Sequence, residues 1–196
     1  MNTVAHSINK TFKRLRVFLQ LDMMATFALR CKCKLEGWAS VYVYPKNRVK
    51  VSKEASIHVV NGLMTFSKPW FEVVETGPCV FEMEKASRLD CNGSFDFVRD
   101  SKCIVKEDAK LSLGDGGRLG KGSQLLCNHE ISIGAHCWIS DNVTISDTGK
   151  IVIEDGTWIG NGVRIEGTMR IGKDAVIGEG VHVKQDIEDG KVITNK

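Results

Sequence analysis

The stretch that decides the fold is residues 130–154, EISIGAHCWISDNVTISDTGKIVIE. Apart from one step of eight, its aliphatic residues recur every six positions, and the step continues beyond it: Ile133, Ile139, Ile145, Ile153, Ile159, Ile165, Ile171 and Ile177. A period of six fits neither the 3.6-residue repeat of a helix nor the simple two-residue alternation of a strand. The repeat therefore indicates a chain that winds in coils of short strands.

The length of one coil follows from where the repeat slips. Counting backward, a second run of six-residue steps ends at Ile131, and the frame restarts two residues later at Ile133. Three hexads and a two-residue slip make one coil, so successive coils begin at 110–114, 130–134 and 150–154, and the last, from Ile171, drops the slip. Each inward aliphatic residue then stacks on its counterpart about 4.8 Å away. This pattern predicts a parallel β-helix.

The rest of the chain divides into a helical segment, residues 1–34, and a β-helix domain, residues 35–196. Within the domain we expect irregular coils over 35–110, where Phe71 and Val73 continue the strand-like alternation, and regular coils over 111–187. A helix over 7–30 is predicted by apolar residues spaced three or four apart, with Ser7 as its cap. Such a helix could cover the open end of the coil stack, which otherwise exposes unpaired backbone groups, or pack between subunits.

Composition sets limits on function. The 196 residues, 42% hydrophobic, suit one soluble unit, and 27 basic against 24 acidic residues give no strong field for nucleic acid. Lys10, Lys13, Arg14 and Arg16 concentrate the positive excess near the N-terminus; they form either a solvated helix face or a contact with a membrane surface or a glycan-assembly complex.

The cysteines indicate the cellular compartment. Seven of them, without paired metal spacing and without a cleavable signal peptide, favour a reducing cytoplasm. Cys31 and Cys33 are too close together for an ordinary zinc site, so no metal is expected. Cys137 occupies an inward hexad position and is predicted to be a core residue.

With these hexads, residues 110–187 resemble the left-handed β-helix acyltransferases of the hexapeptide-repeat class, closest to O-acetyltransferases of sugars and bacterial polysaccharides. The resemblance rests on the runs 131–145, 157–165 and 171–180. It implies an all-β, left-handed parallel β-helix with a short N-terminal helix. It also implies a homotrimer, with acetyl-CoA as co-substrate between neighbouring subunits and a sugar or glycan hydroxyl as acceptor.

In the family a histidine acts as general base, since imidazole accepts a proton near neutral pH. That histidine is expected shortly after Asn142-Val-Thr-Ile, followed by a long loop, but here Lys150 stands in its place and Ile151 begins the next coil at once. A lysine must first lose its proton before it can accept one. His129 is the second candidate, since it precedes Gly149 by one coil period and so lies one coil away from the vacant position; the alternative is an inward, hydrogen-bonded core histidine.

Other site residues follow from the resemblance. Asn142 and Asp147 are predicted to bind the acceptor, although Asn142 is equally suited to a tight corner turn. His136 shares a corner column with Gly116 and Gly156 and is expected to be exposed. Contacts with the co-substrate are predicted for six residues, of which Trp158 could instead pack at a subunit interface: Trp158, Gly160, Gly178, Gly180, His182 and Lys184.

Three functions remain open from the sequence. The first is an acetyl-CoA-dependent O-acetyltransferase for a sugar or surface-polysaccharide hydroxyl. The second is a catalytically inactive scaffold of the same fold, suggested by Lys150 and the missing loop. The third is a nucleotide-sugar N-acetyltransferase, whose amine acceptor is already nucleophilic and needs less help from a base.

Overall fold

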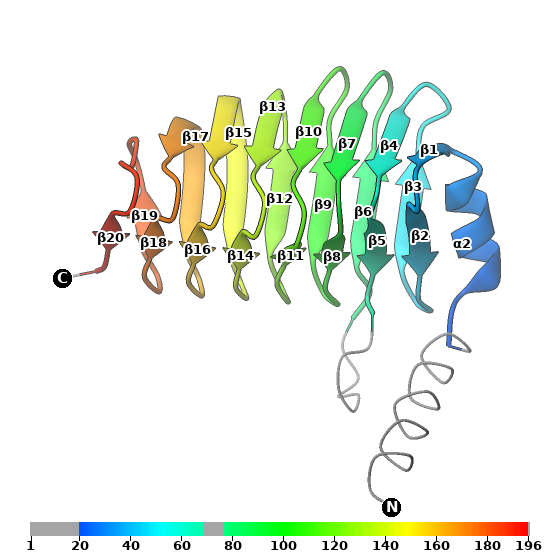
Figure 1. Cartoon of the computed structure of the whole chain (residues 1–196), viewed down its shortest axis with the longest axis horizontal. Coiled ribbons are helices and arrows are strands. Elements are labelled where there is room, and N and C mark those ends of the chain that lie inside the picture. The colour runs from blue at the N-terminus through cyan, green and yellow to red at the C-terminus, as the bar shows by residue number, and fades with distance from the viewer. Residues whose placement is uncertain (1–19, 69–76, 196) are drawn as a thin grey trace, which may run out of the picture.

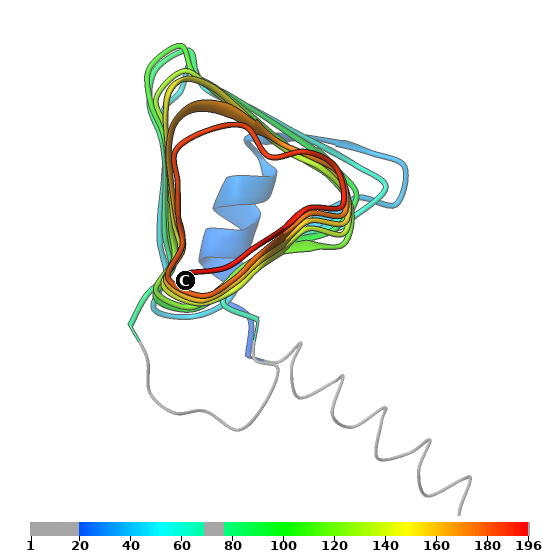
Figure 2. The ribbon, with the colours of Figure 1, turned by 90° about the vertical axis from the view of Figure 1, so that its left-hand side faces the viewer.

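The computed structural model describes residues 20–68 and 77–195. Within these ranges the chain winds into a left-handed parallel β-helix, with one short helix at its N-terminal end (Figure 1). Viewed along the long axis, the coils superimpose as a triangle whose sides are strands and whose corners are turns (Figure 2). The predicted fold class is confirmed.

Each side of the triangle is a face built of parallel strands, one per coil. The first face consists of β1 (Cys33–Glu36), β4 (Ser56–Val60), β7 (Arg88–Asn92), β10 (Lys110–Leu113) and β13 (Glu130–Ile133). The second face consists of β2 (Ser40–Val43), β5 (Leu63–Phe66), β8 (Phe95–Phe97), β11 (Gly117–Leu119), β14 (Trp138–Ile139), β16 (Trp158–Ile159), β18 (Val176–Ile177) and β20 (Val192–Ile193). The third face consists of β3 (Arg48–Val51), β6 (Val80–Met83), β9 (Lys102–Val105), β12 (Gln124–Cys127) and β19 (His182–Val183). Two longer strands, β15 (Thr144–Ile153) and β17 (Arg164–Ile171), run from the third face into the first.

The strand register confirms the predicted coil length where the hexads are regular. Leu111 pairs with Ile131, and Ile131 pairs with Ile151, so each of these coils spans three hexads and the slip. The coil before them is longer, because Leu111 pairs with Leu89, which precedes it by more than three hexads and the slip. The coil after them is shorter, because Ile153 pairs with Ile171, an advance of three hexads alone, so the slip is lost by that point.

From β7 onward, the differences in coil length lie at the third corner, which joins the third face to the first. Residues 106–109 fill this corner between β9 and β10, whereas Asn128 and His129 alone fill it between β12 and β13. In the next coil β15 bends around the corner without a break, and in the coil after that the pairing register shifts between Asp147 and Ile151. The two-residue slip in the sequence therefore corresponds to two residues at one particular corner, and the coil shortens where they are lost.

The core lies inside the triangle and is filled by the residues that alternate inward along each strand. The wider early coils are filled by aromatic rings: Phe66 and Phe97, which are neighbours in adjacent coils, stack with ring centroids 4.9 Å apart and an interplanar angle of 3°. Phe81 meets both rings edge-on. The later, narrower coils use Ile and Val, and Figure 2 shows the last of them inside the outline of the earlier ones.

The helix α2 (Met23–Arg30) covers the N-terminal end of the coil stack (Figure 1). Asp22 caps it, since its side chain accepts the N–H of Ala25 at 2.9 Å. On the buried side, the Thr26 hydroxyl accepts the N–H of Val43 at 3.0 Å and donates to the Val43 carbonyl at 3.2 Å. A helix thus covers the open end of the stack, which was one of the two expectations for it. The predicted span 7–30 is wrong at residues 20–22, which are not helical, because Asp22 begins a new helix at Met23; residues 7–19 lie outside the described residues.

The early part of the chain is more regular than its spacing suggested. Coils begin with β1 at Cys33, so the predicted boundary at residue 35 falls within a strand, and the predicted irregular region 35–110 contains strands of every face. Phe71 and Val73 lie outside the described residues.

The seven cysteines are free. Cys137 is buried, which confirms it as a core residue, and burial raises the pKa of its thiol to about 11. Among the described residues, no helix has the length and apolar character needed to cross a membrane.

Because the aromatic stack fills the wide coils, truncating it should leave a cavity. Phe97→Ala is expected to lower the free energy of unfolding by about 3–5 kcal/mol, measured by chemical denaturation. Phe27→Ala is the matched control, since the Phe27 side chain is 68% exposed on α2, and its change should stay within about 0.5 kcal/mol. Equal effects of the two substitutions would contradict the packing described here.

Candidate active site

The third corner brings two of the sequence-predicted residues together from successive coils. His129 lies at this corner between β12 and β13, and Asp147 occupies the corner in the next coil, within β15. Along β15 the alternation continues from Ile145 to Asp147, so the Asp147 side chain takes an inward position and is fully buried. A carboxylate in such a place needs hydrogen-bond donors, because burial without them costs several kcal/mol.

The donors come from the backbone of the preceding coil. Asp147 Oδ1 accepts the N–H of Asn128 at 2.6 Å, and Asp147 Oδ2 accepts the N–H groups of His129 at 2.8 Å and Glu130 at 3.2 Å. Three consecutive N–H groups thus converge on one carboxylate. Charge-assisted bonds of this kind are stronger than neutral ones, so Asp147 holds the corner in one conformation.

His129 uses the same carboxylate. Its Nδ1 lies 3.2 Å from Asp147 Oδ2, while its side chain is 62% exposed. Because a carboxylate only accepts hydrogen bonds, this contact favours the tautomer with the proton on Nδ1 and leaves a lone pair on Nε2, the nitrogen on the far side of the ring. His129 is therefore not the inward core residue that was the alternative. It is an exposed imidazole oriented by a buried carboxylate.

Asn128 completes the corner, and the sequence reasoning missed it. Its side-chain amide donates to the Asp147 carbonyl at 2.8 Å and to the Ser146 hydroxyl at 3.3 Å. These bonds tie the two coils together beside the histidine. A signal for the whole cluster was present in the sequence, since a charged residue at the inward position after Ile145 requires donors from a neighbouring coil.

Lys150, the other candidate base, lies on the first face rather than at the corner. The strand register pairs it with Glu130, and its Nζ is 2.9 Å from Glu130 Oε1. The side chain is 54% exposed. The geometry therefore places Lys150 in an ion pair on the first face, away from the His129 imidazole at the corner.

Asn142 is not brought close to His129 and Asp147 within one chain. It sits at the second corner, between the second and third faces, with φ +59°, and its N–H donates to the Lys121 carbonyl at 2.8 Å. The extended chain between Asn142 and Asp147 spans roughly 16 Å. His136, as expected, is exposed at the first corner, with its Nδ1 2.6 Å from the point where a Cβ on Gly116 would lie.

Three predicted co-substrate residues share a shallow depression beside the second corner. It has a volume of about 210 Å³ and is lined by Trp158, Gly160 and Gly178, together with Ser140 and Asn161. The Trp158 ring is about half exposed. Packing between coils accounts for a glycine at position 160, because a Cβ there would come within 2.9 Å of the Glu179 nitrogen in the next coil. Gly180 occupies the corner with φ +68°, a backbone conformation that side chains disfavour.

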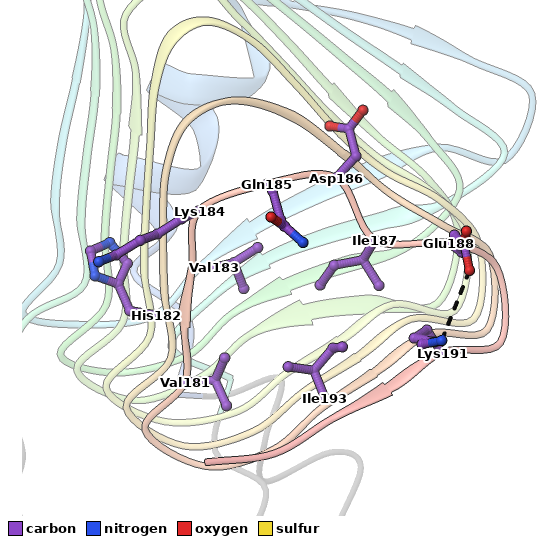
Figure 3. Close-up of a pocket in the computed structure, with 10 residues that line it drawn as sticks. All are labelled: Val181, His182, Val183, Lys184, Gln185, Asp186, Ile187, Glu188, Lys191 and Ile193. Atoms are coloured by element: carbon purple, nitrogen blue, oxygen red, sulfur yellow. Dashed lines mark ion pairs between the residues drawn. The ribbon is translucent and has the colours of Figure 1, made fainter. Parts of the chain in front are cut away.

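His182 and Lys184 lie farther along, at the C-terminal end of the stack. They border a larger cavity of about 470 Å³, into which Val183, Gln185 and Ile187 point, while His182 and Lys184 point outward (Figure 3). His182 Nε2 lies 3.4 Å from Glu166 Oε2. The predicted co-substrate residues therefore form two groups, one at the second corner and one on the third face of the last coils.

Comparison with known proteins places these coils in a family context. Residues 150–185 match the family described as bacterial transferase hexapeptide (six repeats). The chain is 35% identical over 85 residues to the galactoside O-acetyltransferase of Lactococcus lactis subsp. lactis, which covers 35% of this chain and 41% of that protein. It is 32% identical over 95 residues to the acyl-[acyl-carrier-protein]--UDP-N-acetylglucosamine O-acyltransferase of Agrobacterium fabrum, which covers 44% of this chain and 34% of that protein.

Among solved structures, the chain aligns with the polySia specific acetyltransferase NeuO at 17% identity and a TM-score of 0.43, over 81% of each chain. The chain spans less than half the length of each of the two curated relatives named above. The family match thus covers residues 150–185, within the coils of the described structure, and the two curated proteins named above are acyltransferases by name.

Proposed function

We propose that the protein is an acetyl-CoA-dependent O-acetyltransferase that acts on a sugar hydroxyl of a glycan, with His129 as its general base. The observation that carries the proposal is the contact of 3.2 Å between His129 Nδ1 and the buried Asp147 carboxylate. An exposed histidine held in this way has the arrangement that activates hydroxyl nucleophiles in many enzymes. The curated relatives, one of which is named for O-acetyl transfer to galactosides, support the reaction class.

In this mechanism the Nε2 lone pair of His129 takes the proton of the acceptor hydroxyl as its oxygen attacks the thioester carbonyl of acetyl-CoA. Asp147 stabilises the imidazolium that forms, because its carboxylate faces the protonated ring. The imidazolium then returns the proton from Nε2 to the departing thiolate of CoA. The acetyl group ends on the sugar oxygen, and His129 is neutral again. Acetyl-CoA supplies the activated acyl group, and the protein supplies the base and the positioning.

A trimer would bring the separated parts of the site together. The His129–Asp147 pair lies at the third corner, whereas Asn142 and the depression at Trp158 belong to the second corner and the second face. One protomer cannot close a single pocket around both sets of residues. We propose that the third corner of one subunit faces the second corner of its neighbour, with acetyl-CoA in the groove between them and Lys184 as a charge for its phosphates.

A catalytically inactive scaffold is the second candidate, and one observation favours it. β15 runs without interruption from Thr144 to Ile153, so the third corner carries no loop in this coil to enclose an acceptor. A scaffold would keep the corner cluster for its structural value alone. Measurements of acetyl transfer and of co-substrate binding separate this possibility from catalysis.

The first prediction concerns the base. His129→Ala should lower the rate of CoA thiol release with a responsive glycan acceptor by on the order of 10²-fold or more, because proton transfer from the hydroxyl loses its base. The measurement uses a thiol reagent with a panel of mono- and oligosaccharides. His136→Ala is the matched control, since it removes another exposed histidine from a different corner, and it should leave the rate unchanged. An unchanged rate in His129→Ala would remove this residue from the mechanism.

The second prediction concerns the carboxylate. Asp147→Asn replaces an acceptor-only group with an amide whose NH₂ must face backbone donors, so at least one buried N–H loses its partner. The free energy of unfolding should fall by about 1–3 kcal/mol, and acetyl transfer should fall by on the order of 10²–10⁴-fold because the imidazole tautomer is no longer fixed.

Asp155→Asn serves as the control for this change. Asp155 is an exposed corner residue that accepts the N–H of Ala135 at 2.7 Å, and its substitution should cost less than about 1 kcal/mol. If Asp147→Asn lowered stability while transfer by the remaining folded protein stayed at the wild-type rate, Asp147 would have a structural role only.

The third prediction concerns the co-substrate. Acetyl-CoA at about 100 times its Kd should stabilise the protein by about 2.7 kcal/mol, seen as a rise in the melting temperature. Trp158→Ala should reduce that rise, because Trp158 lines the depression at the second corner. Trp138→Ala removes the neighbouring tryptophan one coil away on the same face and should leave the rise in melting temperature unchanged. No rise with the wild-type protein would favour the scaffold.

A further inference from the structure

The outer side of α2 is an exposed apolar surface, which we call the cap surface and define as Met23, Met24 and Phe27. Their side chains are 62%, 82% and 68% exposed, whereas Thr26 and Leu29 hold the opposite side of the helix against the coils. Large apolar side chains gathered in this way on a soluble protein usually mark an interaction site. Trp38, 66% exposed, lies in the turn between β1 and β2, at the same end of the prism.

Positive charge is concentrated in the same part of the chain. Seven of the 27 basic residues but only one of the 24 acidic residues lie within residues 1–34, which gives this segment a net charge of +6 against −3 for the rest. Three of the seven are engaged by the prism: Arg30 donates to the Ser40 hydroxyl, Lys32 donates to the Val51 carbonyl, and Lys34 pairs with Glu36. The other four, between positions 10 and 16, lie outside the described residues and enter here only as charges of the sequence.

We propose that the cap surface docks the protein onto an anionic lipid bilayer, with Met23, Met24 and Phe27 inserted at the headgroup level. Apolar burial and attraction to acidic headgroups add in such contacts, and neither alone is usually strong. Aromatic and thioether side chains on a basic segment suit this partner. A second copy of the chain suits it less, because two segments of the same positive charge would repel each other at close approach.

Docking in this way would orient the candidate active site. α2 lies at one end of the prism (Figure 1), so the long axis would stand away from the lipid surface. Four coil steps separate β1 from β13, which directly follows His129, roughly 19 Å at about 4.8 Å per step. The corner would then face molecules that are themselves attached to the membrane.

The test is sedimentation of the full chain with lipid vesicles. One set contains equal parts phosphatidylcholine and phosphatidylglycerol, and the other contains phosphatidylcholine only. Met24→Ser/Phe27→Ser removes the apolar contact from positions that are already exposed, so folding should be unaffected, which a melting curve checks. Met24→Leu/Phe27→Leu keeps the apolar character, and Val192→Ser removes an exposed apolar residue, 63% exposed, at the opposite end of the prism.

We expect wild type, the double-Leu variant and Val192→Ser to bind the phosphatidylglycerol vesicles, with binding weakened by high salt. The double-Ser variant should bind at least about tenfold more weakly. The proposal would be overturned if wild type did not bind these vesicles, or if the double-Ser variant bound as tightly as wild type. It would also be overturned if the double-Ser change lowered the oligomeric mass in the absence of lipid and left vesicle binding intact, since the cap surface would then be a contact between copies.

Discussion

Hydrogen bonds between neighbouring coils impose one constraint on the whole β-helix: every coil must bring its strands back to the same three faces. The pairings of Leu111 with Ile131 and of Ile131 with Ile151 show this return in the regular part. A residue gained or lost inside a strand would turn every following side chain to the wrong side. Changes in coil length are therefore confined to corners, and as the coils shorten from β7 onward the third corner absorbs the difference.

The candidate site is a consequence of that shortening. When the corner contracts to Asn128 and His129, the chain turns so tightly that three consecutive N–H groups point toward the next coil. The inward Asp147 carboxylate accepts hydrogen bonds from these N–H groups and also contacts the His129 imidazole. Structure and chemistry share one interaction here: the group that satisfies the backbone of the corner also orients the histidine. A compact corner without a long loop can in this way hold an exposed imidazole in one orientation.

Much of the fold could be predicted because inward positions are specified by packing. Ile131, Ile151 and their counterparts occupy equivalent inward positions and fill the same volume in each coil, so their spacing in the sequence gives the coil length. The first coils were harder to predict, since Phe66 and Phe97 stack directly although far more than one regular coil of chain lies between them, which breaks the count. The start of β1 was also not predicted, because Cys33 and Leu35 follow the helix and continue its apolar character.

The site was only partly predictable. His129 and Asp147 could be named as candidates from the repeat and the resemblance, but not as partners. The alternation after Ile145 gives Asp147 an inward position, whereas no repeat fixes the direction of the His129 side chain at the corner. Asn128 gave no signal of its own. Asn142 illustrates the opposite case: its motif suggested binding, and its φ of +59° shows that the second corner also requires it for the turn.

A crystal structure of the protein with acetyl-CoA tests the central claim most directly. The quantity to measure is the distance from His129 Nε2 to the thioester carbon. We predict that the acetyl group lies in a groove between two subunits, with this carbon a few ångströms from Nε2 and room for one hydroxyl between them. Acetyl-CoA bound with its thioester far from every His129 of the assembly would contradict the account.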